Sequence, residues 1–388
     1  MQNILWLASW YPNKYDPYNC DFVQRHAFAV APFCKLSVIS VQFVPTDWQV
    51  PLEVIEQKNT NSFPETIIYL KQSSLPSPFN KLIDQYRYMK AFKQEVRKYL
   101  ANNSPSVAHV HIPVKAGIIG MWLKRKMGIP IVVTEHLGIY NHLAPDNYFK
   151  RSAWFKNLTK RVIKYADVFL PVSKSSGDLI NKIVVAKPFT VVKNVVDTRL
   201  FFYNPTDNSP LFWVVHVSMM NHPKNPKGLL RAFAEAVKLN NNIRLRMIGD
   251  AKDDLIAYTN ELGISDFVVY TGMLPQERVA PLVQQSDVFL LFSNYENMPC
   301  VLAEALCCGL PIIATNVGGI AEIITENNGI LIEPSNEKAC TEAILKMSLY
   351  NNQYNKQSIA EDAASTFSYE VIGKQLSEIY QQTGVLKY

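Results

Sequence analysis

Glycine and cysteine are scarce in this chain, which has 15 glycines and 6 cysteines among 388 residues. The glycines form neither a G-x-G-x-x-G nor a G-x-x-x-x-G-K-[ST] pattern, which argues against a dinucleotide-dependent oxidoreductase and a P-loop enzyme. The cysteines show no C-x-x-C spacing, and three of them fall in one apolar stretch. We therefore expect buried free thiols in a reducing compartment rather than a disulfide framework.

Long apolar segments are also lacking. No run approaches the ~18 residues that a membrane-spanning helix needs, and the N-terminus lacks the basic region of a signal peptide. We therefore expect a cytoplasmic protein, either soluble or peripheral on the inner face of the plasma membrane. The net charge of +6, from 39 basic and 33 acidic side chains, is too modest and too localised to indicate nucleic-acid binding.

Positive charge gathers in residues 149–164, which hold six basic side chains, no acidic one, and the aromatic residues Phe149, Trp154 and Phe155. A basic and aromatic helix of this kind can lie on an anionic membrane surface. It can equally be a solvated helix face whose aromatic side chains belong to the core. Residues 81–99 show a weaker form of the same pattern.

Strand-like and helix-like stretches alternate along the chain, which predicts an α/β protein with parallel sheets. The alternation restarts after a polar, turn-rich segment at 205–210, and 388 residues are too many for one core. We expect two doubly wound, Rossmann-like domains facing across a cleft, with boundaries at 1–193 and 194–368. The last helical stretch, 369–388, can pack back on the first domain or belong to the second. The predicted strands are Ile4–Ala8, Leu36–Val41, Thr66–Leu70, Val107–Ile112, Ile131–Thr134, Val168–Val172, Thr190–Val192, Phe212–Val217, Ile243–Ile248, Phe267–Thr271, Val288–Phe292, Ile312–Thr315 and Ile330–Ile332.

One stretch, Ser293 to Glu322, combines polar and apolar features in an unusual way. Glu304 stands in the middle of an otherwise apolar helix predicted over Pro299–Cys308, and a carboxylate there is costly unless a polar group meets it. Pro299 fits the first helical turn, where a missing N–H has no cost. The loop carrying Glu296 thus leads into a helix N-terminus whose free N–H groups suit an anion.

Glu296 and Glu304 match the Glu-x7-Glu pattern of the retaining glycosyltransferases with the GT-B fold, the large family four, and the chain resembles that family. The match continues through E-A-L-C-C-G-L-P-I-I-A-T-N-V-G-G-I-A-E and is long in the second half. It is thinner in the first half, where Thr134-Glu135-His136 is similar to the family's pattern.

The resemblance implies roles for the two glutamates. Glu304 would accept hydrogen bonds from the ribose of a nucleotide, although an internal salt bridge would also satisfy it. Glu296 would lie near the donor sugar and stabilise positive charge on its ring, although it could instead cap the helix that follows. The donor-binding residues that the resemblance implies are Ser218, Lys224, Gly249, Met273, Asn297, Met298, Pro299, Val301 and Glu304.

A cation pair on the diphosphate is also implied by the resemblance. Lys224 stands where the family has its lysine, or else it is a solvated loop lysine, whereas Met219 occupies the place of the expected arginine. His136 would contact the donor sugar, or else it holds its loop by ordinary hydrogen bonds. Together with Glu296, His136 and Lys224 are the predicted catalytic residues.

No metal and no cofactor beyond the nucleotide-diphosphate-sugar are expected. The sequence has no D-x-D pair of the kind that holds a metal on sugar-nucleotide phosphates, and the spacing of His109, His111, His136 and His142 matches no standard zinc pattern.

The first hypothesis is therefore a retaining glycosyltransferase that moves a sugar to a hydroxyl of a glycan or lipid-linked glycan, in the synthesis of a cell-surface polysaccharide. The second is a catalytically silent scaffold of the same fold that binds a sugar-nucleotide or a glycan, which the missing arginine motivates. The third keeps the fold but changes the chemistry to that of a sugar-nucleotide epimerase or a phosphorylase.

Overall fold

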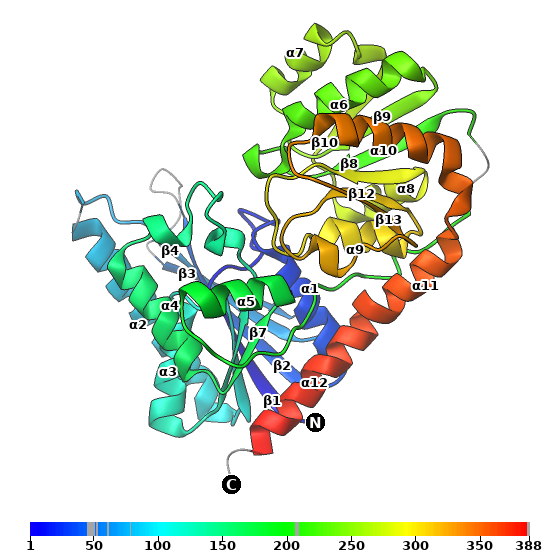
Figure 1. Cartoon of the computed structure of the whole chain (residues 1–388). Coiled ribbons are helices and arrows are strands. Elements are labelled where there is room, and N and C mark those ends of the chain that lie inside the picture. The colour runs from blue at the N-terminus through cyan, green and yellow to red at the C-terminus, as the bar shows by residue number, and fades with distance from the viewer. Residues whose placement is uncertain (45–50, 52, 60–61, 78, 206–208, 386–388) are drawn as a thin grey trace. The chain divides into compact units, whose positions relative to one another are not determined.

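The computed structural model describes residues 1–388 except 45–50, 52, 60–61, 78, 206–208 and 386–388 (Figure 1). The contacts divide the chain into two compact units. The first unit comprises Met1–Tyr140, Tyr148–Lys193 and Tyr369–Tyr388, and the second comprises Asn141–Asn147 and Asn194–Ser368. The chain therefore returns to the first unit after completing the second.

The first unit is built on a sheet that, over the described residues, has seven strands in the order β3-β4-β2-β1-β5-β6-β7. All neighbouring strands are parallel except the β3–β4 pair. The central strands are buried on both faces, which is why they are continuous apolar runs in the sequence. The strands are β1 (Asn3–Ala8), β2 (Lys35–Val44), β3 (Glu53–Asn59), β4 (Pro64–Lys71), β5 (Val107–His111), β6 (Ile131–Glu135) and β7 (Val168–Pro171).

One prediction about this sheet was wrong, and one strand was not predicted. Residues 190–192 were expected to form a strand but are not part of the sheet, although the N–H groups of Thr190 and Val192 each donate to a β7 carbonyl at 3.1 Å. Conversely, the edge strand β3 was missed because its sequence, E-V-I-E-Q-K-N, is largely polar.

The helices of the first unit include α12, which packs against α1 (Figure 1). Gly373 of α12 lies so close to α1 that a Cβ there would be 2.0 Å from the Ala29 carbonyl oxygen. Tyr380 of α12 is fully buried, and its hydroxyl contacts Trp6 Nε1 at 3.1 Å and His109 Nδ1 at 2.6 Å. The C-terminal helix is therefore part of the core of this unit. The helices are α1 (Asp21–Val30), α2 (Phe79–Asn102), α3 (Ala116–Met127), α4 (Ala153–Tyr165), α5 (Lys174–Ile183) and α12 (Tyr369–Val385).

The second unit has a parallel sheet whose described strands follow the order β10-β9-β8-β11-β12-β13. The order runs away from β8 in both directions, so the loops after β8 and β11 diverge at a topological switch point, where such sheets bind ligands. The strands are β8 (Phe212–Val217), β9 (Ile243–Ile248), β10 (Val268–Gly272), β11 (Val288–Leu291), β12 (Ile312–Thr315) and β13 (Gly329–Ile332). The helices are α6 (Pro226–Leu239), α7 (Asp253–Glu261), α8 (Gln276–Gln284), α9 (Cys300–Cys307), α10 (Glu337–Tyr350) and α11 (Lys356–Phe367).

No helix in the described part of the chain combines the length and the apolar character needed to cross a membrane.

Candidate functional site

Lys224 and Glu296 meet at the switch point of the second sheet. Lys224 ends a short 3-10 helix, His222–Lys224, in the loop after β8, and Glu296 lies in the loop after β11. The Lys224 ammonium is 2.5 Å from Glu296 Oε1, and the two side chains are only 19% and 9% exposed. Lys224 is therefore not a solvated loop lysine.

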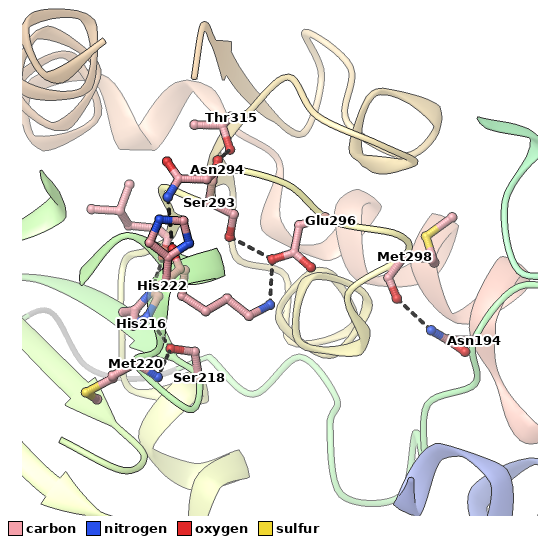
Figure 2. A network of polar contacts seen from close by, with 12 residues as sticks. Asn194, His216, Ser218, Met220, His222, Ser293, Asn294, Glu296, Met298 and Thr315 are labelled. Carbon is pink, nitrogen blue, oxygen red and sulfur yellow. Dashed lines mark hydrogen bonds and ion pairs between the residues drawn. The ribbon is translucent and has the colours of Figure 1, made fainter. Parts of the chain in front are cut away.

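The Glu296 carboxylate has a second partner in its own loop. The Ser293 hydroxyl donates to Glu296 Oε1 at 2.7 Å, and Thr315 at the end of β12 donates to the Ser293 carbonyl at 2.7 Å (Figure 2). Glu296 thus binds Lys224 and Ser293 and does not cap α9, whose N-cap residue is Pro299.

A buried histidine fixes the loop that follows β8. The Ser218 hydroxyl lies 2.7 Å from His216 Nε2 and accepts a hydrogen bond from the Met220 N–H at 2.9 Å (Figure 2). The other ring nitrogen of His216 lies 2.9 Å from the Leu290 carbonyl, so it is the protonated one and Ser218 donates to Nε2. Burial lowers the pKa of His216 to about 4, so the ring is neutral near pH 7.

Two glycines allow the loops to approach closely. At Gly249, where φ is 135°, a Cβ would lie 1.7 Å from the Ser218 carbonyl oxygen. At Gly318, where φ is 58°, a Cβ would lie 2.1 Å from the Glu296 carbonyl oxygen. The next residue, Gly319, donates its N–H to the Asn297 carbonyl at 2.8 Å. The loop that carries Glu296 therefore packs directly on the V-G-G turn.

Glu304 is 5% exposed in α9, in agreement with the expected burial of its carboxylate. The Gln276 side-chain amide, in the first turn of α8, donates to Glu304 Oε1 at 3.2 Å. The helix begins one residue later than predicted, because Pro299 has extended backbone angles and precedes the first helical residue. Burial is also the main cause that raises the pKa of the neighbouring Cys307 thiol to about 12.

The other predicted donor-binding residues also lie at the carboxyl ends of the strands of the second sheet. Met298 is buried, and its carbonyl accepts a hydrogen bond from the Asn194 side chain at 2.6 Å (Figure 2). Met273 follows β10 and is exposed, and Asn297 and Val301 flank the start of α9 and are half-buried. The candidate donor residues therefore follow the carboxyl ends of the four adjacent strands β10, β9, β8 and β11.

His136, the third predicted catalytic residue, belongs to the first unit. It follows β6 and is buried, and its Nε2 lies 3.2 Å from His111 Nδ1 at the end of β5. Glu135 accepts hydrogen bonds at 2.9 Å from the N–H groups of His136 and Leu137 and at 2.5 Å from the Tyr140 hydroxyl. Burial raises the pKa of Glu135 to about 7. The His136 loop is thus held by the buried carboxyl group of Glu135, for which the sequence analysis predicted no role.

The histidines of the first unit form a ring cluster. The His109 and His111 rings lie side by side, with centroids 4.0 Å apart and planes tilted by 37°, as expected for alternate residues that point to one face of a strand. His109 Nε2 lies 2.7 Å from the Thr134 hydroxyl. No group of three or more histidine, cysteine, aspartate or glutamate side chains in the described part of either unit is arranged to hold a metal ion.

Sequence reasoning also missed three polar residues in the second unit, namely Ser293, Asn294 and Gln276. Gln276 binds Glu304. Ser293 binds Glu296, and Asn294 binds the loop that carries Lys224 (Figure 2). The only signal for Ser293 and Asn294 was their place just before Glu296, and Gln276 gave none because it contacts Glu304 across 28 residues of sequence.

Comparisons with known proteins agree with this geometry. A model of the glycosyl transferases group 1 matches residues 203–364, and a model of glycosyltransferase family 4 matches residues 52–200. The chain is 26% identical over 349 residues to N-acetyl-alpha-D-glucosaminyl L-malate synthase of Bacillus anthracis, which covers 81% of this chain and 88% of that protein. It is 24% identical over 267 residues to GDP-mannose:cellobiosyl-diphosphopolyprenol alpha-mannosyltransferase of Xanthomonas oryzae, covering 66% of this chain and 69% of that protein.

The fold is that of solved GT-B structures. Sucrose-phosphate synthase from Thermosynechococcus elongatus superposes with a TM-score of 0.78 over 100% of both chains, at 19% identity. The two family models follow one another along the chain and together span residues 52–364 apart from two residues between them. The chain therefore belongs to glycosyltransferase family 4, the glycosyl transferases group 1, and is a retaining GT-B glycosyltransferase that takes its sugar from a nucleotide-sugar.

Proposed function

We propose that this glycosyltransferase moves a hexose from a nucleotide-diphosphate-sugar to a hydroxyl of a glycan or lipid-linked glycan, in the synthesis of a cell-surface polysaccharide. The observation that carries the proposal is the Lys224–Glu296 pair at the switch point, with Glu304 buried in the next helix. The Xanthomonas relative, whose name describes a diphosphopolyprenol acceptor, supports the lipid-linked class.

In this proposal, Lys224 changes partner when the donor binds. In this structure the Lys224 ammonium neutralises the Glu296 carboxylate at 2.5 Å. A diphosphate carries more charge than a carboxylate and attracts Lys224, so donor binding leaves the Glu296 carboxylate free to face the sugar. Glu296 then stabilises the positive charge that develops on the sugar ring, and Lys224 stabilises the leaving diphosphate.

The family retains the anomeric configuration of the sugar, and no side chain among the described residues of the site stands out as a covalent nucleophile. The proposed transfer is therefore a displacement on one face of the sugar. The bond from the anomeric carbon to the phosphate oxygen breaks, and a bond to the acceptor oxygen forms on the same face of the sugar. The leaving phosphate oxygen takes the proton of the acceptor hydroxyl. Lys224 and the N–H groups at the start of α9 meet the phosphate charge in place of a divalent metal, so EDTA should leave the activity unchanged.

The remaining roles concern binding. Glu304, oriented by Gln276, would accept the ribose hydroxyls, and Ser218, Gly249 and Met273 would contact the nucleotide through their loops. Asn297, Met298, Pro299 and Val301 would line the donor at the start of α9. We assign acceptor binding to the first unit, which also supplies His136 as the proposed contact to the donor sugar.

The test is a panel of nucleotide-sugars added to the purified full chain, with the unfolding temperature as the readout, because a true donor stabilises the folded state by mass action. Glu304→Ala should weaken donor binding, whereas Glu296→Gln should lower turnover and leave binding largely intact. Unchanged donor affinity in Glu304→Ala would contradict the assignment of the ribose site.

A second candidate function is motivated by Met219, which stands half exposed where the family has its diphosphate-binding arginine. A scaffold without activity would bind the sugar-nucleotide but release no nucleoside diphosphate from it. Transfer or donor hydrolysis by the purified protein would exclude this candidate.

We also propose that residues 149–164 contact an anionic membrane surface. Phe149 and Trp154 are 54% and 47% exposed, although both are large and apolar, and Lys150, Lys160 and Lys164 are exposed beside them. The alternative that the aromatic side chains of this segment belong to the core is therefore wrong for Phe149 and Trp154. Phe155 is half-buried.

The start of α2 adds to this membrane proposal. Phe79, Leu82, Ile83 and Tyr86 follow the i, i+3, i+4, i+7 spacing of one helix face, and all four are exposed. The purified protein should float with vesicles that contain an anionic lipid and not with neutral vesicles, and Trp154→Ala should reduce the floated fraction. Equal recovery of the two proteins with anionic vesicles would contradict the proposal.

A further inference from the structure

The two side chains proposed to act on the donor diphosphate and sugar come from separate loops. Lys224 follows β8 and Glu296 follows β11, so their separation depends on how the two loops are joined. The ion pair alone joins them poorly, because a lysine side chain has many rotamers and reaches its partner from many backbone positions. A more rigid connection is needed to hold the two loops in register.

Asn294 provides such a connection through two hydrogen bonds. Its backbone N–H donates to the Pro223 carbonyl at 2.8 Å. Its side-chain Nδ2 donates to the His222 carbonyl at 2.9 Å (Figure 2). These carbonyls belong to the two residues immediately before Lys224, and Asn294 itself stands two residues before Glu296. Asn294 therefore joins the Glu296 loop, to which it belongs, to the Lys224 loop, and it does so next to both functional residues.

Asn294 is in turn held by the sheet. The preceding residue, Ser293, is fully buried, and its carbonyl accepts a hydrogen bond from the Thr315 hydroxyl at the end of β12. Ser293 also donates to the Glu296 carboxylate. Asn294 and Ser293 thus connect the Lys224 loop to the end of β12. Ser293, which is anchored there, also orients Glu296.

The surroundings of Asn294 suit a positioning role better than a role in core packing. Its side chain is half-buried and lines a cavity of about 300 Å³ together with His222, Asn225 and Lys227. Shortening a side chain at a cavity wall leaves no new void in the core, so a substitution here should not unfold the protein.

We infer that Asn294 is a positioning residue that sets the distance from Lys224 to Glu296 and thereby directs the Lys224 ammonium to the donor diphosphate. The inference rests on the proposed function of Lys224. It predicts a selective defect: an Asn294 variant should lose affinity for nucleoside diphosphates and keep its affinity for the bare nucleoside, which has no phosphate for Lys224 to bind.

The experiment is a double-mutant cycle on the full chain, with Lys224→Ala, Asn294→Ala and the double variant. Calorimetry measures the binding of UDP, GDP and ADP, and of the nucleoside whose diphosphate binds the wild type most tightly. Asn294→Ala should weaken diphosphate binding about tenfold, the effect of one misdirected charge-assisted hydrogen bond. In the Lys224→Ala background the same change should have almost no effect, because the residue acts through Lys224.

Asn328→Ala is the matched control. Asn328 also ties a loop by its side chain, donating to the Ile323 carbonyl at 3.0 Å and accepting from the Thr325 N–H at 2.7 Å, but its loop lies before β13, at the opposite edge of the sheet. Its substitution should leave binding of the diphosphate and the nucleoside unchanged. Asn294→Asp, which sets a carboxylate against the His222 carbonyl, should be at least as damaging as Asn294→Ala.

The outcomes separate two failures. If Lys224→Ala weakens diphosphate binding and Asn294→Ala does not, or if the two effects simply add, the role of Asn294 is overturned and that of Lys224 stands. Equal losses of diphosphate and nucleoside affinity in Asn294→Ala would likewise overturn it, because they would indicate general disruption. If Lys224→Ala leaves diphosphate binding unchanged, the proposed phosphate contact fails, and the role of Asn294 fails with it.

Discussion

Replacing Gly318 by alanine should displace Glu296 without changing any side chain of the site. A Cβ at position 318 would lie 2.1 Å from the Glu296 carbonyl oxygen, whereas real Cβ contacts stay at 3.0 Å or more. The loop must therefore retreat by about 0.9 Å, the difference between these distances. Misplacement of a reacting group by about 1 Å can cost about 100-fold in rate, so we expect a loss of that order in turnover.

Gly318→Ala also has a backbone cost, which must be separated from the effect of displacing Glu296. Gly318 has a φ of 58°, and a left-handed backbone costs a residue with a Cβ about 1 kcal/mol. Gly263 has a φ of 69° and no atom within 4 Å of a built Cβ, so Gly263→Ala has the same backbone cost without the collision. The difference between the two variants measures the effect of moving the Glu296 loop.

The assay compares the two variants in release of nucleoside diphosphate from the donor, at saturating donor, and in thermal unfolding. Gly263→Ala should keep wild-type turnover and lose a little stability. Gly318→Ala should have a lower turnover than the wild type, and it should lose more stability than Gly263→Ala does. If the turnover of Gly318→Ala stayed within about threefold of that of Gly263→Ala, the position of Glu296 would not limit the reaction, and its proposed role would be refuted.

Three further predictions follow from the second unit. Folding lowers the pKa of His216 from 6.5 to about 4, so the unfolded state takes up a proton at a higher pH than the folded state does. The free energy of unfolding should therefore fall by up to about 3 kcal/mol as the pH drops from about 6.5 to about 4. Urea unfolding of His216→Asn should lack this contribution to the pH dependence. Burial raises the pKa values of Cys307 and Cys340, so iodoacetamide should alkylate them slowly near neutral pH in the folded protein and rapidly in urea; rapid alkylation without urea would contradict their burial. Gln276→Glu replaces the donor to Glu304 by a second carboxylate, so the nucleotide affinity measured by calorimetry near neutral pH should fall, and an unchanged affinity would contradict the role given to the Gln276–Glu304 contact.

Most of the fold could be predicted from the sequence because its strands are buried. A parallel strand covered by helices on both faces is a short, continuous apolar run, as in Ile4–Ala8 and Ile312–Thr315, and such runs mark their own positions. The edge strand β3 has one solvated side and a polar sequence, so nothing distinguished it from a loop. Conversely, Thr190–Val192 is β-rich but forms only isolated bonds to β7.

The candidate site was predictable as a set of residues and not as a network. Glu304 drew attention because a carboxylate is costly in an apolar helix, and its burial agrees with that argument. The pairing of Lys224 with Glu296 joins residues 72 positions apart, and Asn294 binds backbone carbonyls, which every residue has. A sequence carries no mark of which carbonyl a side chain will find, so these contacts required the structure.

The burial of α12 in the first unit has a consequence for the order of folding during synthesis. Tyr380 completes a core whose other members, such as Trp6 and His109, leave the ribosome more than 250 residues earlier. The second unit lies wholly between these points in the chain, so it can finish folding while the first still lacks its last helix. Domains commonly mature from the N-terminus onward; here the unit that starts first should be the one that becomes stable last.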